Sequence, residues 1–162
     1  MFARLAAAMA LLCLPVLAGA QGAPVAFGQV QSDRSLPIEV TSDNLNVNQA
    51  DNTALFTGSV VISQGAMRLS APRVRVIYLA DQSGIESLEA TGGVTLVSGE
   101  DAAEAARADY NITTGMIELR GDVLLVQGDN AITGETVLVD TAAGTARVSG
   151  RVKTVLQPGG DQ

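Results

Sequence analysis

Three short segments of the chain repeat one pattern of glycine and valine, and the spacing of this pattern constrains the fold more than any other feature. The copies read TGSVVISQG at 57–65, TGGVTLVSG at 91–99 and RGDVLLVQG at 120–128, and a weaker fourth, SGRVKTVLQ, spans 149–157. Their first glycines are 34, 29 and 29 residues apart, and the five extra residues of the first interval fall within 79–84. A repeat of this length indicates stacked supersecondary units.

Apolar and polar residues alternate with a period of two inside each copy, which is typical of β-strands. Every second residue through the glycines gives four equivalent rows: Phe56-Gly58-Val60-Ile62, Ala90-Gly92-Val94-Leu96, Leu119-Gly121-Val123-Leu125 and Val148-Gly150-Val152-Thr154. The second strand of each unit carries the pairs Leu45/Val47, Val74/Val76, Ala108/Tyr110 and Val137/Val139. Turn residues separate the strands at 49–52, 80–84, 113–115 and 141–144. The sequence therefore predicts an all-β chain of repeated two-strand units.

Alignment with the repeat clarifies two further segments of the chain. Residues 42–60 align without a gap on 134–152, so half a unit opens the domain and half a unit closes it. The segment EDAAEAARA at 100–108 could form a helical turn, but the repeat alignment favours a corner and a strand.

The glycines inside the rows are expected to mark bulges or bends where a strand passes from one sheet to another. Rows of Val, Ile and Leu on one face of a sheet normally bury against a second sheet. From residue 21 onward the aromatic residues are only Phe27, Phe56, Tyr78 and Tyr110. A core of small β-branched side chains with so few rings could leave a slot between the sheets that apolar chains would occupy.

The N-terminus has the order of features found in a secretory signal peptide. Arg4 precedes an apolar run from Leu5 to Leu17, and Ala18-Gly19-Ala20 follows as a cleavage site. We therefore expect residues 1–20 to be removed. Residues 21–35 are expected to be a flexible segment, 36–157 the folded domain and 158–162 a flexible tail.

The composition argues against most kinds of catalysis. The chain has no histidine, and its single cysteine, Cys13, lies in the signal segment, so His-based triads, His or Cys metal ligands and thiol nucleophiles are absent. The formal net charge of −7 would repel nucleic acid. We predict no enzyme activity, no cofactor and no metal site. The one basic cluster, Arg68, Arg73 and Arg75, either balances nearby acids or faces an anionic headgroup.

The segments 37–76 and 119–144 resemble the OstA-like family of periplasmic lipopolysaccharide-transport proteins. The resemblance rests on the phrase FTGSVVISQG at 56–65, followed by a small residue and a strand, and it covers roughly 36–157. It implies an open, twisted β-jelly roll whose units stack head to tail.

The resemblance also implies a function in the periplasm. The protein would bind lipopolysaccharide through its lipid A moiety and carry it from an inner-membrane ABC transporter to the outer-membrane assembly complex. The implied neighbours are LptC at the inner membrane, LptD at the outer membrane and further copies of the chain. Because the transporter's ATP drives the movement, the protein itself would catalyse nothing.

The site that the resemblance implies is a lipid-binding groove. Through the segment PIEVTSD, Ile38 and Val40 would lie near its N-terminal mouth. The inward rows would line the rest, namely Phe56, Val60, Ile62, Val74, Val76, Leu96, Tyr110, Leu119, Val123 and Leu125. Compared with better-known members, this chain is acidic, poor in lysine and short at its C-terminus.

Two other interpretations remain open at this point. The chain could be an LptC-like or LptD-like OstA domain, although the cleavage site argues against a retained anchor and the length excludes a complete LptD. It could also be a secreted β-solenoid with a structural role. The rungs of a solenoid would all have the same length. In this chain the five-residue insertion makes the first interval longer than the others.

Overall fold

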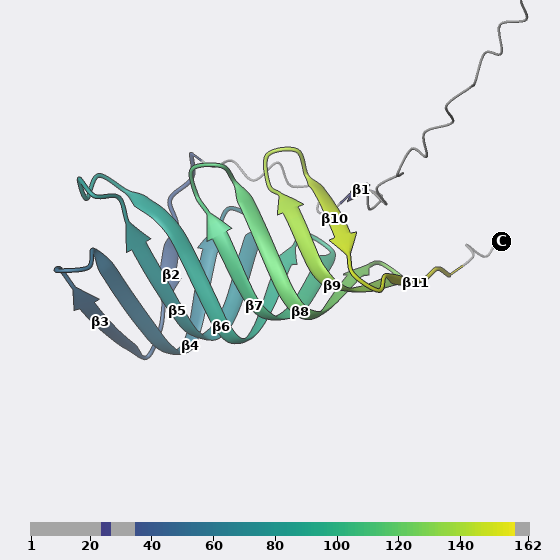
Figure 1. Cartoon of the computed structure of the whole chain (residues 1–162), viewed down its shortest axis with the longest axis horizontal. Coiled ribbons are helices and arrows are strands. Elements are labelled where there is room, and N and C mark those ends of the chain that lie inside the picture. The colour runs from purple at the N-terminus through teal and green to yellow at the C-terminus, as the bar shows by residue number, and fades with distance from the viewer. Residues whose placement is uncertain (1–23, 27–34, 158–162) are drawn as a thin grey trace, which may run out of the picture.

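The computed structural model describes residues 24–26 and 35–157, and these residues form a single sheet of antiparallel strands (Figure 1). The strands are β1 (Pro24–Ala26), β2 (Glu39–Thr41), β3 (Asn44–Asn48), β4 (Thr53–Gln64), β5 (Met67–Tyr78), β6 (Ile85–Ser98), β7 (Asp101–Asn111), β8 (Met116–Gln127), β9 (Asn130–Asp140), β10 (Thr145–Ser149) and β11 (Lys153–Val155). The all-β prediction is confirmed. No helix capable of crossing a membrane occurs in these two ranges.

The long strands follow one another as a meander of hairpins. The order across the sheet is β1-β10-β9-β8-β7-β6-β5-β4-β2, with β3 also paired to β4 and β11 to β9. The predicted turns lie between the strands, and local hydrogen bonds close them. In the turn before β10, for example, the Asp140 carboxylate accepts hydrogen bonds from the backbone N–H groups of Ala142 and Ala143. Because every pairing is antiparallel, the β-solenoid interpretation is wrong.

Each of the long strands bends near its middle, and the bends fold the sheet into two leaves. The register shifts between Thr57 and Val60 in β4, between Thr91 and Val94 in β6, and at the corresponding places in β5, β7 and β8. Leaf A comprises β1, β3, 53–57, 73–78, 85–91, 107–111, 116–120, 136–140 and β10. Leaf B comprises β2, 60–64, 67–71, 94–98, 101–105, 123–127, 130–134 and β11.

The repeated glycines lie at the bends of β4, β6 and β8, as the sequence predicted, whereas β5 bends at Ala71-Pro72 and β7 at Ala105-Ala106. Gly92 and Gly121 have φ angles of +94° and +85°, in the left-handed region where a Cβ is unfavourable. A Cβ at Gly121 would also lie 2.7 Å from the Cβ of Ala106 on the neighbouring strand. The corner of each strand therefore packs directly against the corner of the next.

The favoured interpretation of 100–108 is confirmed, because these residues enter β7 and the register of that strand shifts between Glu104 and Arg107. The fourth copy of the repeat departs from the others. β10 ends at Ser149, and Val152, which parity placed in an inward row, is 51% exposed. The reason is that this copy lies at the end of the sheet, where no further long strand follows to cover it.

The chain before residue 36 contains a strand that was not anticipated. Residues 24–26 fall in the segment expected to be flexible, yet they form β1 and pair with β10. The expected signal peptide at 1–20 and the tail at 158–162 lie outside the described residues.

Candidate lipid-binding interior

Of the twelve residues predicted to line a groove, nine belong to the buried apolar cluster between the two leaves and three pack against it. Nine of them have 0–2% of their surface exposed: Val60, Ile62, Val74, Val76, Leu96, Tyr110, Leu119, Val123 and Leu125. The other three, Ile38, Val40 and Phe56, are partly buried and pack against that cluster. Neighbouring strands place these side chains in register, as in the pairs Val40–Ile62 and Phe56–Val74.

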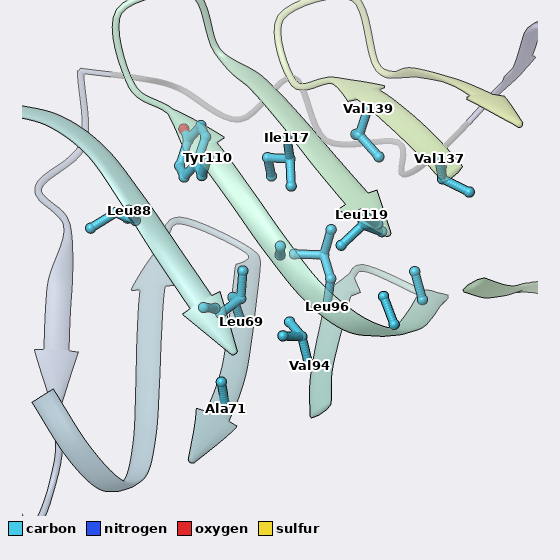
Figure 2. Close-up of a cluster of buried hydrophobic side chains, with 14 of the residues drawn as sticks. Leu69, Ala71, Leu88, Val94, Leu96, Tyr110, Ile117, Leu119, Val137 and Val139 are labelled. Atoms are coloured by element: carbon cyan, nitrogen blue, oxygen red, sulfur yellow. The ribbon is translucent and has the colours of Figure 1, made fainter. Parts of the chain in front are cut away.

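Two apolar rows run along each leaf. In leaf A, the row nearer the bend passes through Leu45, Phe56, Val74, Ala90, Ala108, Leu119, Val137 and Val148. The second row passes through Val47, Ala54, Val76, Leu88, Tyr110, Ile117, Val139 and Ala146. Figure 2 shows side chains of both rows beside Leu69, Val94 and Leu96 of leaf B.

Several interior residues were absent from the predicted groove, including Leu69, Leu88, Ile117 and Ile132. The period-two alternation could have found them, because each is two residues from another inward position on its own strand. Leu88, for example, precedes the inward Ala90. The repeated glycines mark the inward positions nearest to them more clearly than the positions farther along each strand.

The interior is closed in this structure. An exposed fraction near zero means that no water-sized sphere reaches residues such as Leu96, Leu119 and Leu125. Their side chains instead fill the space between the leaves. An acyl chain could enter only if the two leaves moved apart.

A polar row lies along the rim of leaf B, farthest from the bend. Successive register partners place Gln64, Met67, Ser98, Asp101, Gln127 and Asn130 on the same face as the apolar rows. The inner face of leaf B therefore changes from apolar near the bend to mostly polar at its rim.

One member of the polar row connects the two leaves. The Tyr110 hydroxyl of leaf A donates a hydrogen bond of 2.9 Å to Oε1 of Gln64 in leaf B. The Gln64 amide nitrogen donates in turn to the carbonyl of Leu36, at 3.1 Å. Gln64 is only 2% exposed, so these bonds satisfy a buried amide that would otherwise be costly.

The outer face of leaf A carries ion pairs. Arg75 pairs with Glu89 at 2.6 Å, Arg107 with Asp109 at 2.7 Å and Arg120 with Glu118 at 2.6 Å. The hydrogen bond from Arg107 to Asp109, followed by the negative charge of that carboxylate, raises the pKa of Arg107. Pairs this exposed each contribute about 0–1 kcal/mol.

The predicted basic cluster is divided by the bend in β5. Arg73 and Arg75 lie on leaf A, whereas Arg68 lies on leaf B. Because Arg75 is paired with Glu89, that arginine balances a nearby acid.

The two ends of the sheet differ in how they are covered. At the N-terminal end, β3 exposes Leu45 and Val47, which are 56% and 59% exposed although they continue the apolar rows of leaf A. A surface hollow beside them is lined by Val47, Asn48, Gln49, Asn52, Thr53, Tyr78 and Gln82. At the C-terminal end, the three-residue strands β1 and β11 cover leaf A and leaf B respectively.

The open two-leaf sheet and its apolar inner face define an open, twisted β-jelly roll. Residues 39–145 match the family described as LptA/(LptD N-terminal domain) LPS transport protein, and the chain belongs to that family. The resemblance inferred from the sequence is thereby confirmed.

Individual relatives agree with this assignment. A protein of Rhizobium meliloti is 31% identical over 140 residues, covering 80% of this chain and 75% of that protein. The lipopolysaccharide export system protein LptA of Haemophilus influenzae is 30% identical over 140 residues, covering 80% of this chain and 81% of that protein. The crystal structure of LptH, described as the LptA-homologous periplasmic component of the lipopolysaccharide transport device of Pseudomonas aeruginosa, has the same fold. Its TM-score is 0.71 at 22% identity, over 78% of this chain and 99% of that one.

Proposed function

We propose that this protein binds lipopolysaccharide in the periplasm and carries it from the inner-membrane transporter to the outer-membrane assembly complex. The single observation that supports this most is the continuous apolar inner face, which runs the length of a sheet belonging to a lipopolysaccharide-transport family. Lipid A acyl chains would replace contacts between the leaves, and burying each methylene contributes about 0.8 kcal/mol. The groove residues would be the twelve predicted from the sequence.

The polar rim suggests how the lipid would be oriented. Acyl chains would lie near the bend, where both leaves are apolar, and sugar hydroxyls would lie toward Gln64, Ser98 and Asp101, whose oxygens can accept hydrogen bonds. This arrangement would keep the polar sugars out of the apolar interior, where polar groups without partners are strongly unfavourable.

The protein would act as one unit of a larger assembly. The folded unit is 36–157, delivered to the periplasm by a signal peptide at 1–20. LptC would bind at the inner membrane and LptD at the outer membrane, with further copies stacked head to tail between them. The chain would contribute binding surfaces and no catalysis. The match to LptA of Haemophilus influenzae, which covers 81% of that protein, favours an LptA-like carrier over an LptC-like or LptD-like domain.

Site-specific photo-crosslinking to lipopolysaccharide tests the groove. A photoreactive residue at Val60 or Tyr110, both on the inner face, is expected to form adducts with the lipid. The same residue at Ser59 or Ser63, on the outer side of β4, is expected to form none. Lipopolysaccharide stripped of its acyl chains serves as the control ligand, and thermal melts show that each variant is folded. Equal labelling of the two sets would contradict the groove assignment.

A further inference from the structure

Strand β1 covers one specific edge of the molecule. It pairs antiparallel with β10, placing Pro24 opposite Arg147, Val25 opposite Ala146 and Ala26 opposite Thr145. Leaf B holds it as well, because the side-chain amide of Gln127 donates a hydrogen bond to the carbonyl oxygen of Ala26. β1 thus covers the β10 edge of leaf A, at the C-terminal end of the sheet.

The direction of β1 matches that of the first strand of leaf A, at the opposite end. β10 runs toward the bend, from Thr145 opposite Asp140 to Ser149 opposite Thr136. β3 runs away from the bend, because Asn44 lies opposite Thr57 at the corner. If a second copy continued the sheet with its leaves aligned, its β3 would therefore lie antiparallel to β10, in the place and direction that β1 has now.

The side chains of β3 suit this position. Leu45 and Val47 begin the two apolar rows of leaf A and are largely exposed, while the same rows end at Val148 and Ala146 next to β1. Joining the ends would make each row continuous from one copy to the next. β3 has five residues and β1 only three, so the incoming strand can form the longer ladder.

We propose that β1 is an internal placeholder on the edge of β10, and that β3 of a second copy displaces it when two copies join. The inference rests on the head-to-tail association in the proposed function and adds the step that regulates it. The C-terminal edge is closed in the single molecule and opens only in exchange for a matching strand. Such a device protects an edge that would otherwise pair indiscriminately.

A reversible disulfide between β1 and β10 tests the exchange. The variant Ala26→Cys/Thr145→Cys is made with Cys13→Ser, so that only two thiols remain. Both positions are exposed and directly opposite, and Cα atoms of such pairs are about 4.5–5.5 Å apart, within the range of a disulfide. We expect the oxidised protein to associate at least tenfold more weakly than the same protein after reduction, as measured by sedimentation velocity.

Matched variants separate the placeholder from other effects. Thr95→Cys/Glu104→Cys joins two strands in the middle of leaf B, and its oxidation should leave association unchanged. Gln127→Ala, which releases the carbonyl of Ala26, should strengthen association.

Three results would overturn the proposal: failure of the 26–145 disulfide to form, a disulfide without effect on association, or no association in any form. Crosslinking of lipopolysaccharide to position 60 in the same proteins reports on lipid binding separately. Lipid adducts without redox-dependent association would reject the exchange alone. Redox-dependent association without lipid adducts would reject the proposed lipid function alone.

Discussion

Gly92 and Gly93 occupy the same region of backbone conformation but meet different neighbours. Their φ angles are +94° and +95°. A Cβ at Gly92 would lie 2.6 Å from Cγ of Pro72, whereas a Cβ at Gly93 would meet nothing within 4 Å. The first glycine is therefore required by both conformation and packing, and the second by conformation alone.

Alanine at these two positions should separate the two requirements. Gly93→Ala is expected to lower the free energy of unfolding by about 1–2 kcal/mol, the usual strain of a left-handed residue. Gly92→Ala carries the same strain and must also displace the rigid ring of Pro72, so we expect it to cost at least about 1 kcal/mol more. Urea unfolding of both variants measures the difference. Equal losses would mean that the contact between corners does not stabilise the bend.

At the scale of elements, the two ends of the sheet have different chemistry. β3 presents apolar side chains and pairs only with β4 among the described strands, so its other edge is open, and edges of this kind favour strand addition. Adjacent residues of β3 point to opposite faces of the sheet, so one can serve as a control for the other. Val47 lies on the inner face, whereas Asn46, opposite Leu55, lies on the outer face.

Lysine at these two positions should therefore affect head-to-tail association differently. Val47→Lys places a charge in the row that would be buried between copies, and we expect association to weaken at least tenfold. Asn46→Lys adds the same charge to the outer face and should change association less than twofold. Sedimentation velocity gives both constants, and unchanged thermal melts exclude unfolding. A similar loss in both variants would indicate a general charge effect instead of a specific edge.

At the scale of the whole molecule, a closed interior implies that lipid binding must separate the leaves. The hydrogen bond between Tyr110 and Gln64 crosses from one leaf to the other, so it would report on that movement. The chain has two tyrosines and no tryptophan, which makes the emission of a single residue observable.

In the variant Tyr78→Phe, Tyr110 is the only remaining tyrosine. Titration with lipopolysaccharide is expected to change its emission, because the hydroxyl loses its partner and the ring meets acyl chains. Lipopolysaccharide without acyl chains should cause no change. If intact lipid crosslinks to inner positions while the emission of Tyr110 stays constant, the leaves need not separate for binding.

Much of this fold follows from local features of the sequence. The strands, the turns between them and the inward rows were predictable, because a period of two is visible within a few residues. The bends of β4, β6 and β8 were predictable as well, since Gly58, Gly92 and Gly121 have positive φ there, whereas β5 and β7 bend without a glycine. The alternation also indicated which side chains lie between the leaves: nine of the twelve candidate groove residues are in the buried cluster and three pack against it, while their contact with lipid stays a prediction.

Other features depended on register between distant strands, and only the tertiary structure decided them. A three-residue strand has no periodicity of its own, so the pairing of Ala26 with Thr145 could not be read from the chain. The polar row aligns Gln64, Ser98 and Asp101 only because three different strands pair in a particular register. The sequence by itself determined which side chains face inward along the long strands, although not at the end of the sheet, where Val152 is exposed. How closely the two leaves meet, and which strand covers each edge, depended on packing between residues far apart in the chain.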